Sequence, residues 1–208
     1  MHTSVFSSLL RFRTGLAAAV VLSSALVFPG CTKQQLANAA SYLIIDSLQA
    51  APGASTTFGG TLSSDVLTIV SGTPTIFADN GRFTLRLGLT DPGSVDSPSS
   101  PSTANYITVT RFHVKYTRTD GLNTQGVHVP FEFEGGLTVT VGDAPVTVGF
   151  TLVNAFAKDR APLADLVNGG SIPTVAEVTL FGTDQVGRAV SVKGTISVVF
   201  RNWGDPTS

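Results

Sequence analysis

Histidines and paired carboxylates are the side chains of this chain whose types could support catalysis or metal binding. After the first thirty residues the only histidines are His113 and His128. A histidine can act as a general base or bind a metal ion, but no second ligand lies at a spacing typical of a zinc site. Glu132 and Glu134 are two residues apart, so on a strand they share a face and could act as an acid and base pair. We expect solvated strand faces instead, because glycosidases usually carry their two carboxylates on separate elements.

Aspartates in predicted loops are the candidates for calcium ligands. They are Asp79, Asp91, Asp96 and Asp120. A dedicated calcium site takes roughly six to eight oxygens from a defined loop, and no EF-hand or nonapeptide pattern is present. Turn chemistry alone explains aspartates at such positions, so the sequence predicts neither a metal site nor a cofactor.

The sequence gives equally little support for a catalytic serine or for an aromatic surface that binds carbohydrate. No serine lies in a Gly-x-Ser-x-Gly elbow, and Gly169 and Gly170 precede Ser171 at a predicted helix end, where glycine is expected as a cap. No Gly-rich phosphate loop precedes a helix. The remaining candidates for a carbohydrate platform are scattered: Tyr42, Tyr106, Tyr116 and Trp203. The sequence therefore predicts no catalytic residues and a protein that is not an enzyme.

The charge distribution argues against nucleic-acid binding. The chain has 13 basic and 14 acidic residues, and they are scattered rather than clustered on a basic face. Arg111, Lys115 and Arg118 form a modest cationic stripe on one predicted strand. This stripe could touch an anionic surface, but we expect it to be an ordinary solvated sheet face.

The N-terminal stretch is typical of a secretory signal. Arg11 and Arg13 precede the apolar run from Gly15 to Phe28. That run is too short for a membrane-spanning helix, which needs about 20 apolar residues, and it matches the apolar region of a signal peptide. Without residues 1–30 the chain has 208 − 30 = 178 residues and a net charge of 11 − 14 = −3, because Arg11 and Arg13 are lost.

The end of this leader carries the most specific motif. Phe28-Pro29-Gly30-Cys31 resembles the lipobox of bacterial lipoproteins, which implies that Cys31 is lipidated and becomes the new N-terminus. Cys31 is the only cysteine in the chain, so it cannot form an internal disulfide, and a lone thiol in an oxidising compartment needs another use. The alternative is cleavage after Ala37-Asn38-Ala39, which would release a secreted protein without Cys31.

Alternating apolar and polar residues predict strands over most of the chain after residue 41. The expected strands span residues 42–48, 66–70, 83–89, 106–118, 137–141 and 146–152, with an extended edge segment at 127–133. The face of the apolar residues changes within 106–118, which predicts a bulge near Thr110 and Arg111. A hairpin is expected from 176 to 200, with its turn at 184–187.

Turn and helix signals separate these strands. Asp79-Asn80-Gly81 predicts a tight turn, because Asn-Gly readily adopts positive φ angles. The segment 94–104 is rich in Ser and Pro and predicts a long exposed loop. Lys158-Asp159-Arg160-Ala161-Pro162 opens a predicted short helix that ends at Asn168-Gly169-Gly170.

These elements predict an all-β fold, an antiparallel immunoglobulin-like β-sandwich of roughly seven to eight strands with one short helix. The core cysteine pair of true immunoglobulin domains is absent, so the likeness is one of architecture, and a small barrel is the alternative. The expected organisation is a signal peptide at 1–30, a lipidated N-terminus and tether at 31–41, a sandwich domain at 42–204 and a tail at 205–208.

We expect a membrane-anchored envelope lipoprotein that acts as a non-catalytic binding or structural module. Lipid on Cys31 would hold it at the bacterial cell envelope, at the outer membrane or a periplasmic face. A protein partner is expected at the loops 94–104 and 158–172 or at a sheet edge. An accessory subunit of an envelope or surface assembly, a hydrolase of envelope polymers and a free secreted protein stay open as alternatives.

Overall fold

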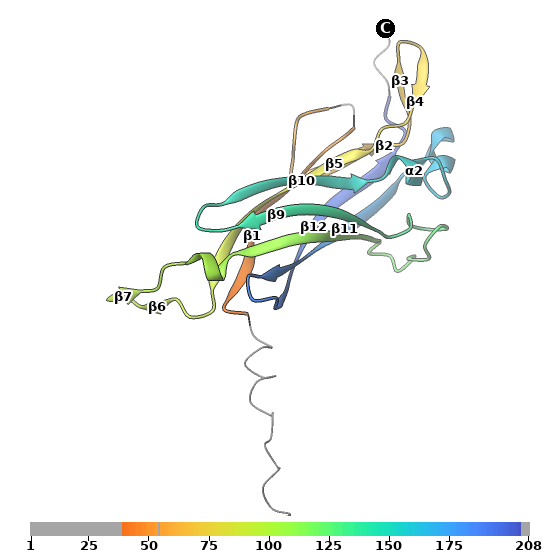
Figure 1. The fold of residues 1–208 in the computed structure, drawn as a ribbon. Helices are drawn as coiled ribbons and strands as arrows, with labels where there is room; N and C mark the ends of the chain where they lie inside the picture. The colour runs from red at the N-terminus through yellow and green to blue at the C-terminus, as the bar shows by residue number, and fades with distance from the viewer. Residues whose placement is uncertain (1–38, 54, 205–208) are drawn as a thin grey trace, which may run out of the picture. The chain divides into compact units, whose positions relative to one another are not determined.

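The computed structural model describes residues 39–53 and 55–204, and these residues form two β-sheets packed face to face (Figure 1). The three-stranded sheet has the order β1-β5-β10, and the five-stranded sheet has the order β2-β12-β11-β8-β9. Within the sheets all pairings are antiparallel except that of β2 with β12, which is parallel. The prediction of an all-β sandwich is confirmed, and its immunoglobulin-like character stays a prediction.

In the described part of the chain, eight strands build the two sheets, and two short hairpins and three helical turns lie outside them. The three-stranded sheet contains β1 (Ser41–Ala51), β5 (Asp79–Leu89) and β10 (Val146–Val153). The five-stranded sheet contains β2 (Thr61–Asp65), β8 (Ile107–Thr117), β9 (Phe133–Val141), β11 (Ile172–Asp184) and β12 (Ala189–Arg201). The small elements are β3 (Thr68–Val70), β4 (Thr73–Thr75), β6 (Gly93–Ser94), β7 (Ser97–Pro98), η1 (Thr103–Asn105), α2 (Ala155–Lys158) and η2 (Ala164–Asn168).

The alternating sequence pattern places the core between the sheets. Every second residue of a strand points to the same face, and the long hairpin β11–β12 buries its even-numbered residues, as the sequence predicts. Its buried members are Ile172, Thr174, Ala176, Val178, Leu180, Asp184, Val190, Ile196, Val198 and Phe200. Phe83 and Leu85 of β5 face them from the other sheet and are fully buried. Burial of such side chains stabilises the fold by about 1.5–3 kcal/mol each.

The predicted bulge in β8 is confirmed. The register of β8 against β9 shifts between Val109 and Arg111, and its register against β11 shifts at the same place. Opposite β9 the extra residue lies on β9, where Leu137 and Thr138 stand against Thr110 alone. Opposite β11, Thr110 itself is the extra residue. It lets Val109 and Phe112 both face the core although their sequence positions differ in parity.

Three strand and turn predictions are wrong in position. Asp79-Asn80-Gly81 begins β5 and pairs with both β1 and β10, because sheet pairing on two sides outweighs a local turn preference. Of the strand expected at 66–70, only Thr68–Val70 is a strand, β3, and β2, which ends at Asp65, was not predicted. The segment 127–133 is mostly irregular, and β9 begins only at Phe133.

The predicted helix also begins at a different residue. Asn154 caps α2, and its side chain accepts a hydrogen bond of 2.9 Å from the backbone N–H of Phe156. The α-helix therefore starts before Lys158, and it ends there. Pro162 lacks an N–H group and cannot continue it, so the rest of the segment forms the 3-10 turn η2. The exposed loop 94–104 contains the hairpin β6–β7 and part of η1.

Candidate functional site

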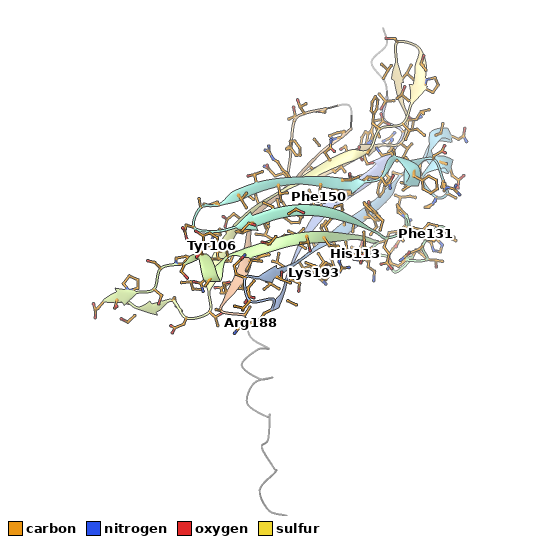
Figure 2. The ribbon with its side chains drawn as sticks, viewed as in Figure 1. Tyr106, His113, Phe131, Phe150, Arg188 and Lys193 are labelled. Carbon is orange, nitrogen blue, oxygen red and sulfur yellow. The ribbon has the colours of Figure 1, made fainter. Side chains whose placement is uncertain are left out.

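The outer face of the five-stranded sheet brings together the histidine and carboxylates singled out in the sequence. Nε2 of His113 lies 3.5 Å from Oε2 of Glu132. Nη1 of Arg111 lies 2.6 Å from Oε1 of Glu134. Each carboxylate therefore has its own basic partner on β8, and the two glutamates do not form an acid and base pair. His113 and Lys193, both labelled in Figure 2, lie on this face.

Two of the three cations in the predicted stripe, Arg111 and Arg118, form ion pairs with acidic side chains. Arg111 pairs with Glu134 and also covers the ring of Phe181 at 4.1 Å. Lys115 stands opposite Glu177 in the strand register, but the ion pair of Glu177 is with Lys193, at 2.8 Å. Arg118, just after the end of β8, forms an ion pair with Asp120. These are exposed pairs of the kind that contribute about 0–1 kcal/mol each, and the arrangement matches an ordinary solvated sheet face.

The loop aspartates do not converge. Asp91 and Asp120 accept hydrogen bonds from backbone N–H groups two residues further on, which is turn chemistry. Asp96 is exposed. Across residues 39–53 and 55–204, no three His, Cys, Asp or Glu side chains gather in a way that could hold a metal ion. Asp79 differs from the others, because it is buried in a strand rather than exposed in a loop.

The tyrosines and glycines of the sequence analysis have structural roles. The hydroxyl of Tyr116 is buried and donates to the backbone carbonyl of Leu152 at 2.5 Å, and burial raises its pKa, to which the nearby charge of Asp79 adds. The hydroxyl of Tyr106 is exposed and donates to Asp143 at 2.7 Å. Gly169 and Gly170 have φ angles of 113° and 97° and end η2. None of these residues forms part of a catalytic arrangement.

A buried ion pair is the most unusual polar feature of the described chain. Nζ of Lys158 lies 2.8 Å from Oδ1 of Asp79, and the two side chains are 1% and 0% exposed. The backbone N–H of Gly53 donates to Oδ1 at 2.9 Å, and the hydroxyl of Ser64 donates to Oδ2 at 2.6 Å. Nζ also donates to the backbone carbonyl of Asp65 at 2.7 Å. The residues that meet at this carboxylate and amine thus come from four segments, at 53, 64–65, 79 and 158.

Burial acts on both charges of this pair in opposite directions. It raises the pKa of the Asp79 carboxyl, while the charge and hydrogen bond of Lys158 lower it by a smaller amount. It lowers the pKa of the Lys158 amine, against the attraction of Asp79. Desolvation therefore favours the neutral acid and the neutral amine over the ionised pair.

Local sequence signals do not predict this pair, because they assign each partner to a surface element. Lys158 was expected at the start of an exposed helix and Asp79 in a turn. One signal could have placed Asp79, since it shares odd parity with Phe83 and Leu85 on the buried face of β5. No comparable signal marks Lys158, because only the tertiary structure brings the end of α2 to β5.

A groove opens where the two sheets separate, between the edge strands β9 and β10. These strands run side by side in Figure 1 and are joined by a hairpin turn, but neither is a hydrogen-bonded neighbour of the other. The groove has a volume of about 720 Å³. Phe112 and Phe150 line it, with ring centroids 5.3 Å apart. Gly135 and Gly149 also line it, so part of its wall is bare backbone.

Apolar side chains remain incompletely covered along the same opening. Four inward-facing residues of the edge strands are only half-buried: Leu137, Val139, Val146 and Val148. A second hollow of about 260 Å³ lies between 130–133 and 154–161 and has an apolar rim, where Phe131 and Phe156 are 61% and 60% exposed. Within residues 39–53 and 55–204, this open side of the sandwich combines uncovered apolar side chains with unpaired strand edges.

Cys31 and the cleavage sites predicted beside it lie outside the described residues. Within the described part of the chain, no helix is long and apolar enough to cross a membrane. No protein-family model, no curated protein and no solved structure significantly matches this chain. The leader motif and the geometry of the sandwich are therefore the features that bear on function.

Proposed function

We propose that the protein is a lipid-anchored envelope protein whose β-sandwich binds an extended strand of a partner protein along its open side. The sequence motif ending at Cys31 supports the anchor. The groove between β9 and β10 supports the binding mode, and no residue of the sandwich need perform chemistry. Of the three contact surfaces expected from the sequence, the sheet edge has the strongest support, ahead of the loops 94–104 and 158–172.

This proposal depends on one observation: the edge strands β9 and β10 are unpaired on one side, and their inward-facing apolar residues are only half-buried. A β-strand edge presents a row of backbone donors and acceptors to which another chain can pair. Strand addition uses these groups for affinity and side-chain pockets for specificity. An incoming strand with apolar residues at alternate positions would pair with β9 or β10 and cover Val148 and Leu137, which the sandwich itself leaves half-exposed.

Labelling tests the anchor. Cells that produce the full chain are grown with a palmitate analogue, and the wild type is compared with Cys31→Ser. We expect label on the wild type alone, because the lipid would be attached at the cysteine. Equal labelling of both proteins, or none of the wild type, would contradict the anchor and favour the secreted alternative.

Photo-crosslinking tests the binding mode. A photoreactive amino acid replaces Gly136, which lines the groove and where an added Cβ would meet nothing within 4 Å. The expected adduct joins this position to a partner segment with alternating apolar residues. Val148→Lys points a charge into the opening and should abolish the adduct. The matched control is Thr147→Lys, which is on the exposed face of the same strand and should leave the adduct unchanged.

The alternatives make different predictions in the same experiment. An accessory subunit of an envelope assembly would give one stoichiometric partner at Gly136. A hydrolase of envelope polymers would give no protein adduct, and its activity would depend on carboxylates such as Glu132. Adducts that persist in Val148→Lys, or their absence from the protein that carries only the photoreactive residue at position 136, would refute strand addition.

A further inference from the structure

The buried cluster around Asp79 holds an amine and a carboxyl group in contact and away from solvent. The 2.8 Å separation of Nζ and Oδ1 places the nitrogen of Lys158 beside the carboxyl carbon. The exposed pair Lys193 and Glu177 has the same separation, but its side chains are 56% and 34% exposed. The difference between the two pairs is therefore their access to water.

An ionised pair is expensive at the buried site. Removal of two charges from water is strongly unfavourable for each ion, and their attraction does not always offset this cost. Burial drives the pKa of Asp79 upwards and the pKa of Lys158 downwards. Transfer of the proton from Nζ to the carboxyl group gives a neutral amine with a free electron pair next to a neutral carboxylic acid.

We propose that Lys158 and Asp79 condense to form an intramolecular amide bond. The electron pair of Nζ forms the bond to Cγ of Asp79, and the bond from Cγ to Oδ2 breaks. Oδ2 leaves as water with its own proton and one proton from Nζ, so no oxidant, reductant or other reactant is needed. The site is a self-modification site, independent of the strand-binding groove.

The neighbouring donors fit this reaction. The N–H of Gly53, 2.9 Å from Oδ1, stabilises the negative charge that develops on that oxygen during attack. The hydroxyl of Ser64, 2.6 Å from Oδ2, binds the oxygen that leaves. When a fold holds two reacting groups in contact, their reaction is as fast as if one group were present at a very high concentration. Both groups are held by the fold, Asp79 at the start of β5 and Lys158 at the end of α2.

The bond would serve as a cross-link in a chain that has no second cysteine for a disulfide. It would join β5 to the segment after β10 and close the intervening chain into a loop. Cross-links of this kind restrict the unfolded chain and are more effective for long loops. Unlike a disulfide, an amide is unaffected by the redox state of the compartment.

Peptide mapping of the full chain tests the proposal. The protein is purified from cells, unfolded, digested with trypsin and analysed by mass spectrometry. We expect the peptides that contain Asp79 and Lys158 to appear joined, with a combined mass lower by one water molecule. Lys193 and Glu177 provide the internal control and should appear in unlinked peptides. Lys158→Arg and Asp79→Ala should each abolish the joined product.

The wild-type digest is decisive whatever the variants do. If it contains the Asp79 peptide and the Lys158 peptide only as separate species, the pair is an ordinary ion pair and the proposal is wrong. Joined peptides in the wild type that persist in Lys158→Arg would assign the link to another lysine and also refute it. Neither result affects the palmitate or photo-crosslinking experiments.

Discussion

Replacement of Tyr116 by phenylalanine should destabilise the sandwich by about 1–3 kcal/mol, the cost of leaving a buried polar group without its partner. The hydroxyl of Tyr116, on β8, donates to the carbonyl of Leu152, on β10, and so connects the two sheets. Leu152 lies at a register shift of β10 and has no partner residue on β5. The phenyl ring of the variant would keep the contact that the Tyr116 ring makes with Phe200, whose centroid is 5.5 Å away, so the change isolates the hydrogen bond.

The assay is urea-induced unfolding followed by far-UV circular dichroism, with the midpoint and slope fitted for each variant. The matched control is Tyr106→Phe, which removes an exposed hydroxyl bonded to Asp143. In this control, water can bind Asp143 in place of the lost hydroxyl. The control should therefore change the free energy of unfolding by less than about 0.5 kcal/mol. If both variants lose the same stability, or if Tyr116→Phe stays within about 0.5 kcal/mol of the wild type, the buried carbonyl of Leu152 does not need the hydroxyl of Tyr116 as its partner.

Three further substitutions have defined outcomes. Gly182→Ala places a Cβ 2.4 Å from a backbone carbonyl oxygen of β8 and should cost about 1–3 kcal/mol, whereas Gly136→Ala meets nothing within 4 Å and should be nearly neutral in the same unfolding assay. Asn154→Ala removes the cap of α2 and should cost about 1 kcal/mol, which Asn154→Asp should restore. The hydrogen bond from Arg118 lowers the pKa of Asp120, so the stabilisation from Asp120 is present above the ordinary carboxyl pKa and lost as the pH falls through the lowered one. Arg118→Gln should move the NMR titration midpoint of Asp120 upwards, and an unchanged midpoint would contradict that assignment.

The sequence determined the features that depend on short-range patterns. Alternation along 176–200 predicts the hairpin and its buried face, because side chains of a strand alternate between faces whatever the strand packs against. The parity change near Thr110 predicts the bulge for the same reason, since an extra residue is the simplest way to keep both halves of β8 facing the core. The lipidation of Cys31 is also inferred from a short linear motif, and it stays a prediction.

The tertiary structure alone decided the features that depend on distant segments. Asn80-Gly81 has a local preference for a turn, yet pairing with β1 and β10 on both sides holds it in β5. The contact of Lys158 with Asp79 joins residues 79 positions apart in the sequence. The open groove exists because β9 and β10, though joined by one hairpin turn, belong to different sheets. Local patterns specify strands and faces, whereas strand neighbours and buried polar partners are set by the packing of the whole sandwich, and no single stretch of sequence records them.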